Sequence, residues 1–217
     1  LSASLPNMRA PGLAGPIALT VCCLHGYSFI YLDSDAAHEI GVGCAGGVDV
    51  TATRSYIEEP TPQTAIPYLI NIKGLQGGHS GMDIHKGFGN ANKLMSRLLY
   101  NGFERFGLRV SRIDGGSLRN AIPRESTAIV VVDAVHKTTF EEATRALISA
   151  IEKEFQTLEP ELNISINPSK LPAMVMELGV QQPLLKALNA AHNGVFRISP
   201  DIEGLVETSN NVARVLV

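Results

Sequence analysis

The chain is poor in cysteine and in charge, and it contains no solenoid-type repeat and no low-complexity tract. Its three cysteines, Cys22, Cys23 and Cys44, form no Cys-x-x-Cys pair, which argues against a disulfide framework and indicates free thiols in a reducing compartment, the cytoplasm. The formal net charge of −3 provides no basic field that would attract nucleic acid. With 45% apolar and 18% charged residues, the 217 residues have the composition of a globular protein of one or two domains.

Residues 13–32 form the most apolar window of the sequence. Arg9 precedes this window, whose small residues imitate a signal peptide or a short membrane span. Pro16, His25 and two glycines weaken a membrane helix in this window, so we expect a buried helix followed by a strand, and no membrane partner. Because an apolar strand pattern still continues at Val217, we expect the chain to be a piece of a longer protein.

Two glycine-rich segments carry the most informative polar residues. Residues 77–81 read Gly-Gly-His-Ser-Gly, and residues 115–123 read Gly-Gly-Ser-Leu-Arg-Asn-Ala-Ile-Pro. Glycine adopts positive φ and leaves no side chain in the way, so His79 lies on backbone that can approach another molecule closely. A single Gly-Gly-His is more often a turn with an incidental histidine. The second segment, one predicted helix and one predicted strand later, favours a functional site.

Periodicity predicts how these segments are placed. Alternating or β-branched runs predict strands at residues 66–73, 108–113, 127–134 and 162–166. A helical pattern begins at Phe88 with Gly102 as its expected stop, and the Thr139-x-x-Glu142 spacing of a capping box is expected to open a second helix. The order is β-α-β-β-α-β, which is typical of ferredoxin-like α/β domains.

A cluster of prolines at residues 57–67 is the best candidate for a domain boundary. We therefore expect one domain over residues 1–60 and a second over residues 61–217. In the first, a buried strand is predicted to end at Asp33, where α/β enzymes often carry active-site carboxylates. In the second, a further helix is expected to have Pro183 in its first turn.

Together, these motifs resemble the zinc-dependent exopeptidase superfamily of aminoacylases, carboxypeptidases and dipeptidases, and within it the aminoacyl-histidine dipeptidases. The matching residues keep the order of the family and lie at positions 43–47, 77–81, 84–85, 89–94, 118–125, 206–209 and 211. The resemblance implies an α/β chain that joins the remnant of a zinc-exopeptidase catalytic domain to a ferredoxin-like lid, or dimerisation, domain that is truncated at its C-terminus. It also implies a homodimer that forms through the lid.

The same resemblance implies hydrolysis of a dipeptide, preferably one with a C-terminal histidine, at a centre of two zinc ions. Asp33 falls where the family places a zinc-binding aspartate, although taken alone it reads as a turn residue. His79 falls at the histidine that stabilises the oxyanion of the tetrahedral intermediate, often in the active site of the partner subunit. Asn120, His85 and Asn211 are the candidate substrate-binding residues; the alternative for Asn120 is a turn residue that caps local backbone.

The N-terminal region departs from the family pattern. The family carries two adjacent glutamates, a general base and a zinc ligand, before a Gly-x-x-Gly; in this chain that glycine motif places Arg9 and Ala10 at the two positions. Arginine accepts no proton at usable pH and alanine binds no metal. Two hypotheses therefore stay open: a dipeptidase covered in part, or a catalytically silent homologue or dimerisation module without a complete metal centre. A separate metal site at His79 and His85 with Asp83 is disfavoured, because the spacing of the two histidines suits neither a helix nor a compact ribbon.

Overall fold

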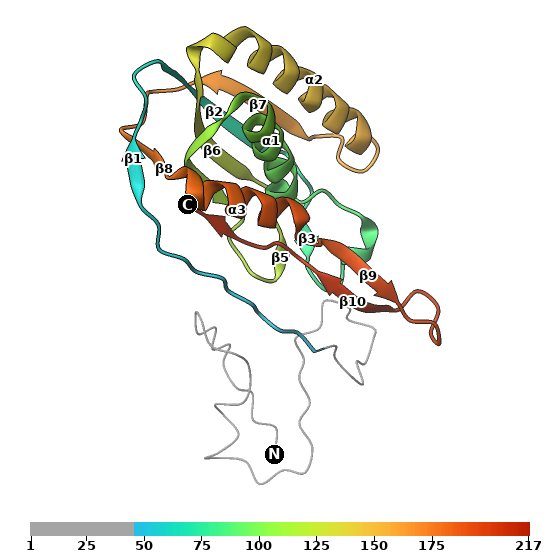
Figure 1. Cartoon of the computed structure of the whole chain (residues 1–217). Coiled ribbons are helices and arrows are strands. Elements are labelled where there is room, and N and C mark those ends of the chain that lie inside the picture. Colours follow the sequence, from blue (N-terminus) through green and yellow to red (C-terminus); the bar gives the residue numbers. More distant parts are fainter. Residues whose placement is uncertain (1–45) are drawn as a thin grey trace, which may run out of the picture. The chain divides into compact units, whose positions relative to one another are not determined.

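The computed structural model of the chain describes residues 46–217 (Figure 1). The chain divides into two compact units, residues 1–48 and residues 49–217, and the described helices and strands all belong to the second. The sequence predictions that lie outside the described residues are those for the apolar window, the three cysteines, Arg9, Ala10 and Asp33. Of the helices in the described part, none is long and apolar enough to cross a membrane.

A five-stranded antiparallel sheet forms the centre of the second unit, with the strand order β11-β4-β6-β2-β7. The strands are β2 (Ala65–Lys73), β4 (Arg109–Gly115), β6 (Ser126–Asp133), β7 (Asn163–Pro168) and β11 (Val215–Leu216). Helix α1 (Ala91–Phe106) follows β2, and helix α2 (Lys137–Phe155) follows β6. The predicted ferredoxin-like order and the α/β fold class are confirmed, and β11 extends one edge of the sheet.

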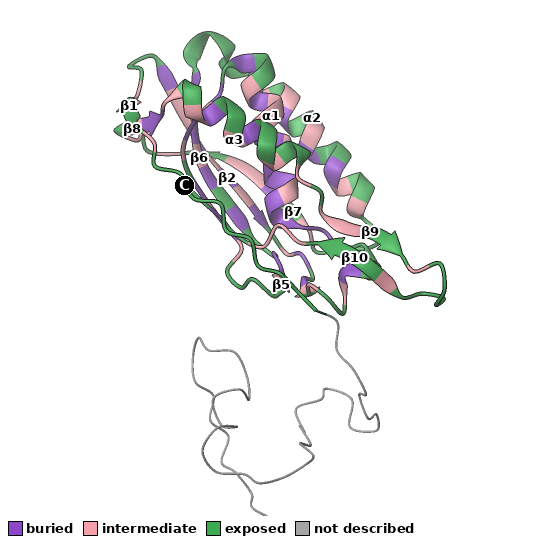
Figure 2. Cartoon of the chain, turned by 60° about the horizontal axis from the view of Figure 1, so that its bottom comes forward, coloured by how far each residue is buried: buried purple, intermediate pink, exposed green. Residues whose placement is uncertain are grey.

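The hydrophobic core lies between the sheet and helices α1 and α2, which pack against it (Figure 1). Tyr68, Ile70 and Ile72 alternate along β2 and are at most 3% exposed, as expected when every second side chain of a strand faces the core. Leu99 of α1 and Phe140 of α2 enter the same cluster from the helices. Figure 2 shows this burial as a band between helices and strands. Burying each such side chain contributes about 2 kcal/mol.

Helix α1 does not end where the sequence predicts. It continues past Gly102 and ends before Gly107, whose φ of 62° is the left-handed conformation that glycine supplies at a helix C-terminus. Gly102 is buried within the helix, where a Cβ would lie 2.7 Å from Leu108 Cδ1. The glycine therefore allows close packing rather than stopping the helix.

The other two helix starts also differ from prediction. Thr139 caps no helix, because α2 begins at Lys137 and the Thr139 hydroxyl donates to the carbonyl of His136 (3.0 Å). Helix α3 (Leu178–Ala190) contains Pro183 in its interior. Within this helix, the buried Gln181 amide bonds the backbone around the start of β4 through both of its polar atoms.

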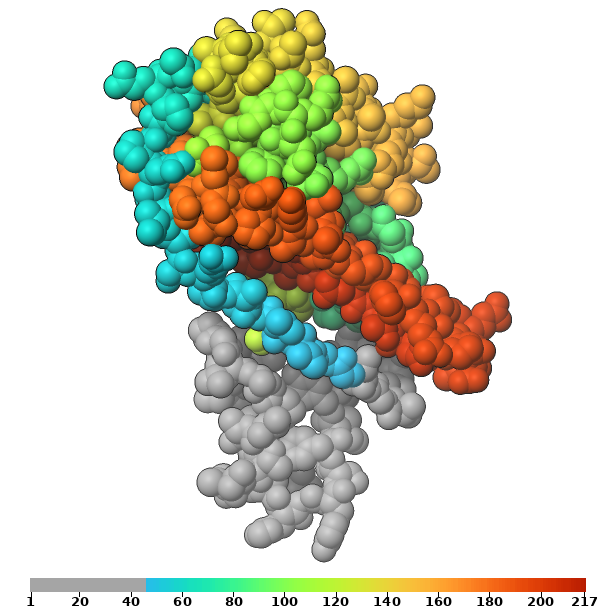
Figure 3. Space-filling model, viewed as in Figure 1, coloured from blue at the N-terminus to red at the C-terminus, as the bar shows by residue number. Residues whose placement is uncertain are grey.

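Three two-stranded ribbons lie outside the main sheet in the described residues, and two of them are long enough to stand out. Strand β1 (Glu58–Pro60) pairs with β8 (Met174–Met176), and β9 (Gly194–Ile198) pairs with β10 (Val206–Asn210) to form an arm (Figures 1 and 3). Through β1, residues within the proline cluster itself pair with β8 of the same unit. The predicted division into domains 1–60 and 61–217 stays a prediction.

Candidate functional site

The structure joins the two glycine-rich segments by a short β-pair. Strand β3 (Gly78–His79) runs antiparallel to β5 (Ala121–Ile122), with His79 opposite Ala121. The pairing continues as the N–H of Ser80 donates to the carbonyl of Asn120 at 2.9 Å. His79 and Asn120, 41 positions apart in the sequence, therefore lie at neighbouring backbone positions.

The glycines before His79 are required by backbone conformation and by space. Gly77 has φ 70° and Gly78 has φ 141°, both in the region that side chains disfavour. A Cβ on Gly78 would lie 2.8 Å from the carboxylate of Asp83, and one on Gly77 would lie 2.4 Å from Cγ of Arg124. The chain thus passes between two side chains immediately before it presents the histidine.

The imidazole of His79 is oriented by the backbone that follows it. The N–H groups of Gly81 and Met82 both donate to Nδ1 of His79, at 3.1 Å each. Because Nδ1 acts as an acceptor, the neutral ring carries its proton on Nε2. The side chain is exposed, so Nε2–H is available as a hydrogen-bond donor to a molecule outside the loop.

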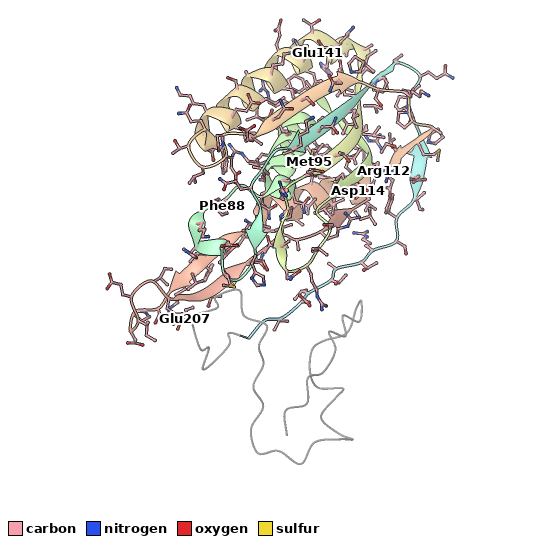
Figure 4. All side chains as sticks on the ribbon, turned by 180° about the vertical axis from the view of Figure 1, so that it is seen from behind. Phe88, Met95, Arg112, Asp114, Glu141 and Glu207 are labelled. Atoms are coloured by element: carbon pink, nitrogen blue, oxygen red, sulfur yellow. The ribbon has the colours of Figure 1, made fainter. Side chains whose placement is uncertain are left out.

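Asp83 fixes the backbone of the same turn. Its Oδ2 accepts the N–H of His79 at 2.7 Å, and its Oδ1 forms an ion pair with Nζ of Lys86 at 2.7 Å. The bond to Lys86, followed by the bond from the His79 N–H, lowers the pKa of Asp83 below its usual value. Lys86 also lies over the ring of Phe88, 5.8 Å from its centroid; Figure 4 labels Phe88 beside this loop.

A pair of asparagines, Asn211 and Asn90, supports strand β5 of the β-pair. Nδ2 of Asn211 donates to the carbonyl of Ala121 at 2.8 Å, and Oδ1 of Asn211 accepts from Nδ2 of Asn90 at 3.1 Å. Asn90 is also the N-cap of α1, where its Oδ1 accepts the N–H groups of Asn92 and Lys93. Strand β5 is thereby connected to the start of α1.

Comparison with known proteins agrees with this architecture. Residues 70–159 match the family described as a peptidase dimerisation domain. The cytosol non-specific dipeptidase of Escherichia coli (strain K12) is 35% identical over 212 residues, which cover 98% of this chain and 44% of that protein. The crystal structure of aminoacylhistidine dipeptidase from Vibrio alginolyticus superimposes with a TM-score of 0.72 and 38% identity, over 75% of this chain and 33% of the other. The chain is a homologue of these two dipeptidases.

The predicted relationship is thus confirmed, and the dipeptidase homologue spans less than half the length of either relative. The remaining site predictions concern side chains in different settings. The side chain of Asn120 is exposed, whereas both polar atoms of Asn211 are already bonded to protein groups. His85 is exposed on the short 3₁₀ helix η2 (Ile84–Lys86). This helix contacts β9 and is not part of the β3–β5 pair. Their roles in substrate binding stay predictions.

The described residues of this chain do not by themselves bring together the ligands of a zinc centre. Zinc in proteins takes three or four His, Cys or carboxylate ligands. Within residues 46–217, no three such side chains converge. The carboxylate of Asp83 is engaged with Lys86 and the backbone of His79.

Three supports of the His79 loop were not predicted from the sequence. Asn90 follows a glycine and precedes a helical pattern, which is the signal of an N-cap and could have identified it. Asp83 gives no such signal, because its contacts are local hydrogen bonds that any turn aspartate can form. The third support, Glu159, lies still farther along the chain and bonds the loop at its base.

Proposed function

We propose that this chain forms part of a zinc-dependent dipeptidase with a preference for dipeptides that end in histidine, and that His79 is its oxyanion donor. The observation that carries the proposal is the β3–β5 pair with the turn that follows it, where two backbone N–H groups donate to Nδ1 of the exposed His79 and leave its Nε2–H as the free donor. Homology to a dipeptidase and to an aminoacylhistidine dipeptidase supports the reaction and the substrate class.

In this proposal, His79 acts on charge that develops during peptide hydrolysis. When a nucleophile attacks the peptide carbonyl, the oxygen becomes an oxyanion, and Nε2–H of His79 donates to it. A donor that is oriented before the reaction stabilises such a transition state by about 3 kcal/mol. Asn120, which lies at the neighbouring backbone position, is proposed to bind the substrate; His85 and Asn211 are proposed as weaker contributors.

Zinc would be held by residues other than those described. We propose that Asp33 contributes one ligand, and that further ligands come from chain segments outside residues 46–217. Such a centre would polarise the carbonyl and supply the water nucleophile. Because residues 70–159 match a dimerisation domain, we also propose that the lid forms a homodimer, and the name of the E. coli relative supports a cytoplasmic location.

The second candidate is a catalytically silent homologue, or a dimerisation module, that keeps the lid without a working metal centre. It is favoured by Arg9 and Ala10, which stand where the family has its catalytic and metal-binding glutamates. Neither side chain can replace a glutamate in these roles.

Hydrolysis of an Xaa-His dipeptide by the purified chain in the presence of zinc distinguishes the two candidates. The dipeptidase proposal predicts turnover, and equilibrium dialysis should find about two zinc ions per chain, as a two-metal site requires. Absence of both turnover and bound zinc, together with a dimer in light scattering, would favour the silent module. A monomer in light scattering would contradict the proposed homodimer.

A further inference from the structure

The loop that carries His79 is closed at its base by a buried carboxylate. Glu159, which follows α2 and precedes β7, is only 1% exposed. Its Oε2 accepts the N–H of Gln76 and its Oε1 accepts the N–H of Gly89, both at 2.7 Å. Gln76 and Gly89 lie at the two ends of the segment between β2 and α1. A single side chain therefore bonds both ends of the loop.

Local structure places Glu159 at this position. Its N–H donates to the carbonyl of Phe155 at 2.8 Å, and its own carbonyl accepts from Leu162 at 3.0 Å, so its backbone is fixed between the end of α2 and β7. On the other side, a Cβ on Gly89 would lie 2.6 Å from Leu75 Cδ2 and 3.5 Å from Glu159 Cγ. The glycine therefore leaves room for the Leu75 side chain, while a Cβ there would lie at ordinary contact distance from Glu159.

The two bonds are of a kind that constrains a loop strongly. Hydrogen bonds to a carboxylate are shorter and stronger than those between neutral groups, and a buried N–H that loses its acceptor is costly. Within the loop, Asp83 bonds the N–H of His79, and the N–H groups of Gly81 and Met82 bond its ring. These inner bonds orient the imidazole relative to the loop, and Glu159 orients the loop relative to the sheet and α1.

We propose that Glu159 is a positioning residue for His79: its carboxylate closes the loop and holds Nε2–H where the oxyanion forms. The inference rests on the proposed function, because it takes His79 as the oxyanion donor. In this proposal, Glu159 does not contact the substrate. It acts only through the hydrogen bonds that it accepts from two backbone N–H groups.

The physical part of the proposal is tested in this chain by amide hydrogen exchange measured by NMR. In Glu159→Gln, an amide NH₂ replaces one of the two acceptor oxygens. The hydrogen-exchange rates of the backbone amides of His79, Gly81 and Met82 should then rise by about tenfold or more. The exchange rate of the Val130 amide in β6 should rise less. Glu161→Gln, an exposed neighbour, is the matched control. If Glu159→Gln does not fold, Glu159→Asp, which keeps the charge on a shorter side chain, should show the same local effect.

Loop exchange equal to that of Glu161→Gln would overturn the proposal, and so would an equal acceleration at Val130, which indicates a role in overall stability alone. Dipeptide hydrolysis adds a second readout: Glu159→Gln should lower kcat with little change in KM, and should have no further effect in a His79→Ala background. Independent, multiplicative losses of kcat would contradict positioning through His79. If His79→Ala leaves kcat unchanged, the proposed function fails, and the exchange result still decides whether Glu159 holds the loop.

Discussion

The core and the His79 loop of the same unit are held by different forces. In the core, Ile70 and Val130 are at most 1% exposed and pack against apolar side chains from the helices. In the loop, the backbone N–H of the exposed His79 donates to Asp83, and Asn211 donates to the carbonyl of Ala121 in the paired strand β5. Apolar packing fixes the fold, whereas a few directional polar bonds fix the orientation of the histidine.

This difference implies that the two regions can be disturbed separately. Loss of a core side chain should weaken the whole unit, because the sheet and helices share one cluster. Loss of a polar support should act mainly on the loop, whose bonds contribute little to the core. The following substitutions test that separation, from the largest expected effect to the smallest.

Truncation of a core side chain should have the largest effect on stability. Leu99 is fully buried in α1, and Leu99→Ala leaves a cavity, so the free energy of unfolding should fall by about 3 kcal/mol. Urea unfolding followed by circular dichroism measures this change. A loss below about 1 kcal/mol would mean that the core tolerates cavities and that the proposed contrast with the loop is wrong.

Removal of the asparagine that caps α1 should have an intermediate effect on stability. Asn90→Ala removes the cap and the bond to Asn211, so the free energy of unfolding should fall by about 1 kcal/mol. The side-chain amide of Asn211 should at the same time lose its protection from hydrogen exchange. Asn101→Ala, in the same helix, is the control and should leave that amide protected; equal behaviour of the two variants would refute the connection from α1 to β5.

The smallest effect is expected from the ion pair in the His79 turn. Because Lys86 lowers the pKa of Asp83, Asp83 supports the turn above its unfolded pKa of about 3.9, and this support is lost as the pH falls through the lower folded value. Lys86→Met should therefore raise the pKa of Asp83 toward its usual value in a carboxyl ¹³C NMR titration. Lys170→Met should leave it unchanged, and a Lys86→Met titration identical to wild type would contradict the assigned cause.

The sequence was sufficient to predict the topology of the core. Alternation in β2, the β-branched run of β6 and the helical period of α1 each reflect local geometry that a short window contains. The helix ends were predicted less well. Gly102 packs against Leu108 instead of stopping α1, and Gln181 of α3 bonds backbone around the start of β4, 71 and 73 positions earlier in the sequence.

The site was predictable only in part. The glycines flanking His79 are visible as a motif, since backbone conformation demands glycine there. The residues that orient the loop are not visible, because Glu159 lies 80 positions after His79 and Asn211 lies 132 positions after it. An isolated glutamate after a helix reads as a solvated residue, and only the folded chain shows that both of its oxygens accept backbone N–H groups.

The most direct test of the account is the effect of His79→Ala on hydrolysis of an Xaa-His dipeptide. If Nε2–H of His79 stabilises the oxyanion, kcat should fall roughly a hundredfold or more with little change in KM. His136→Ala, an exposed histidine at the opposite end of β6 from the β3–β5 pair, should retain wild-type kcat. A His79→Ala variant that folds normally and keeps the kcat of the His136→Ala control would contradict the central claim.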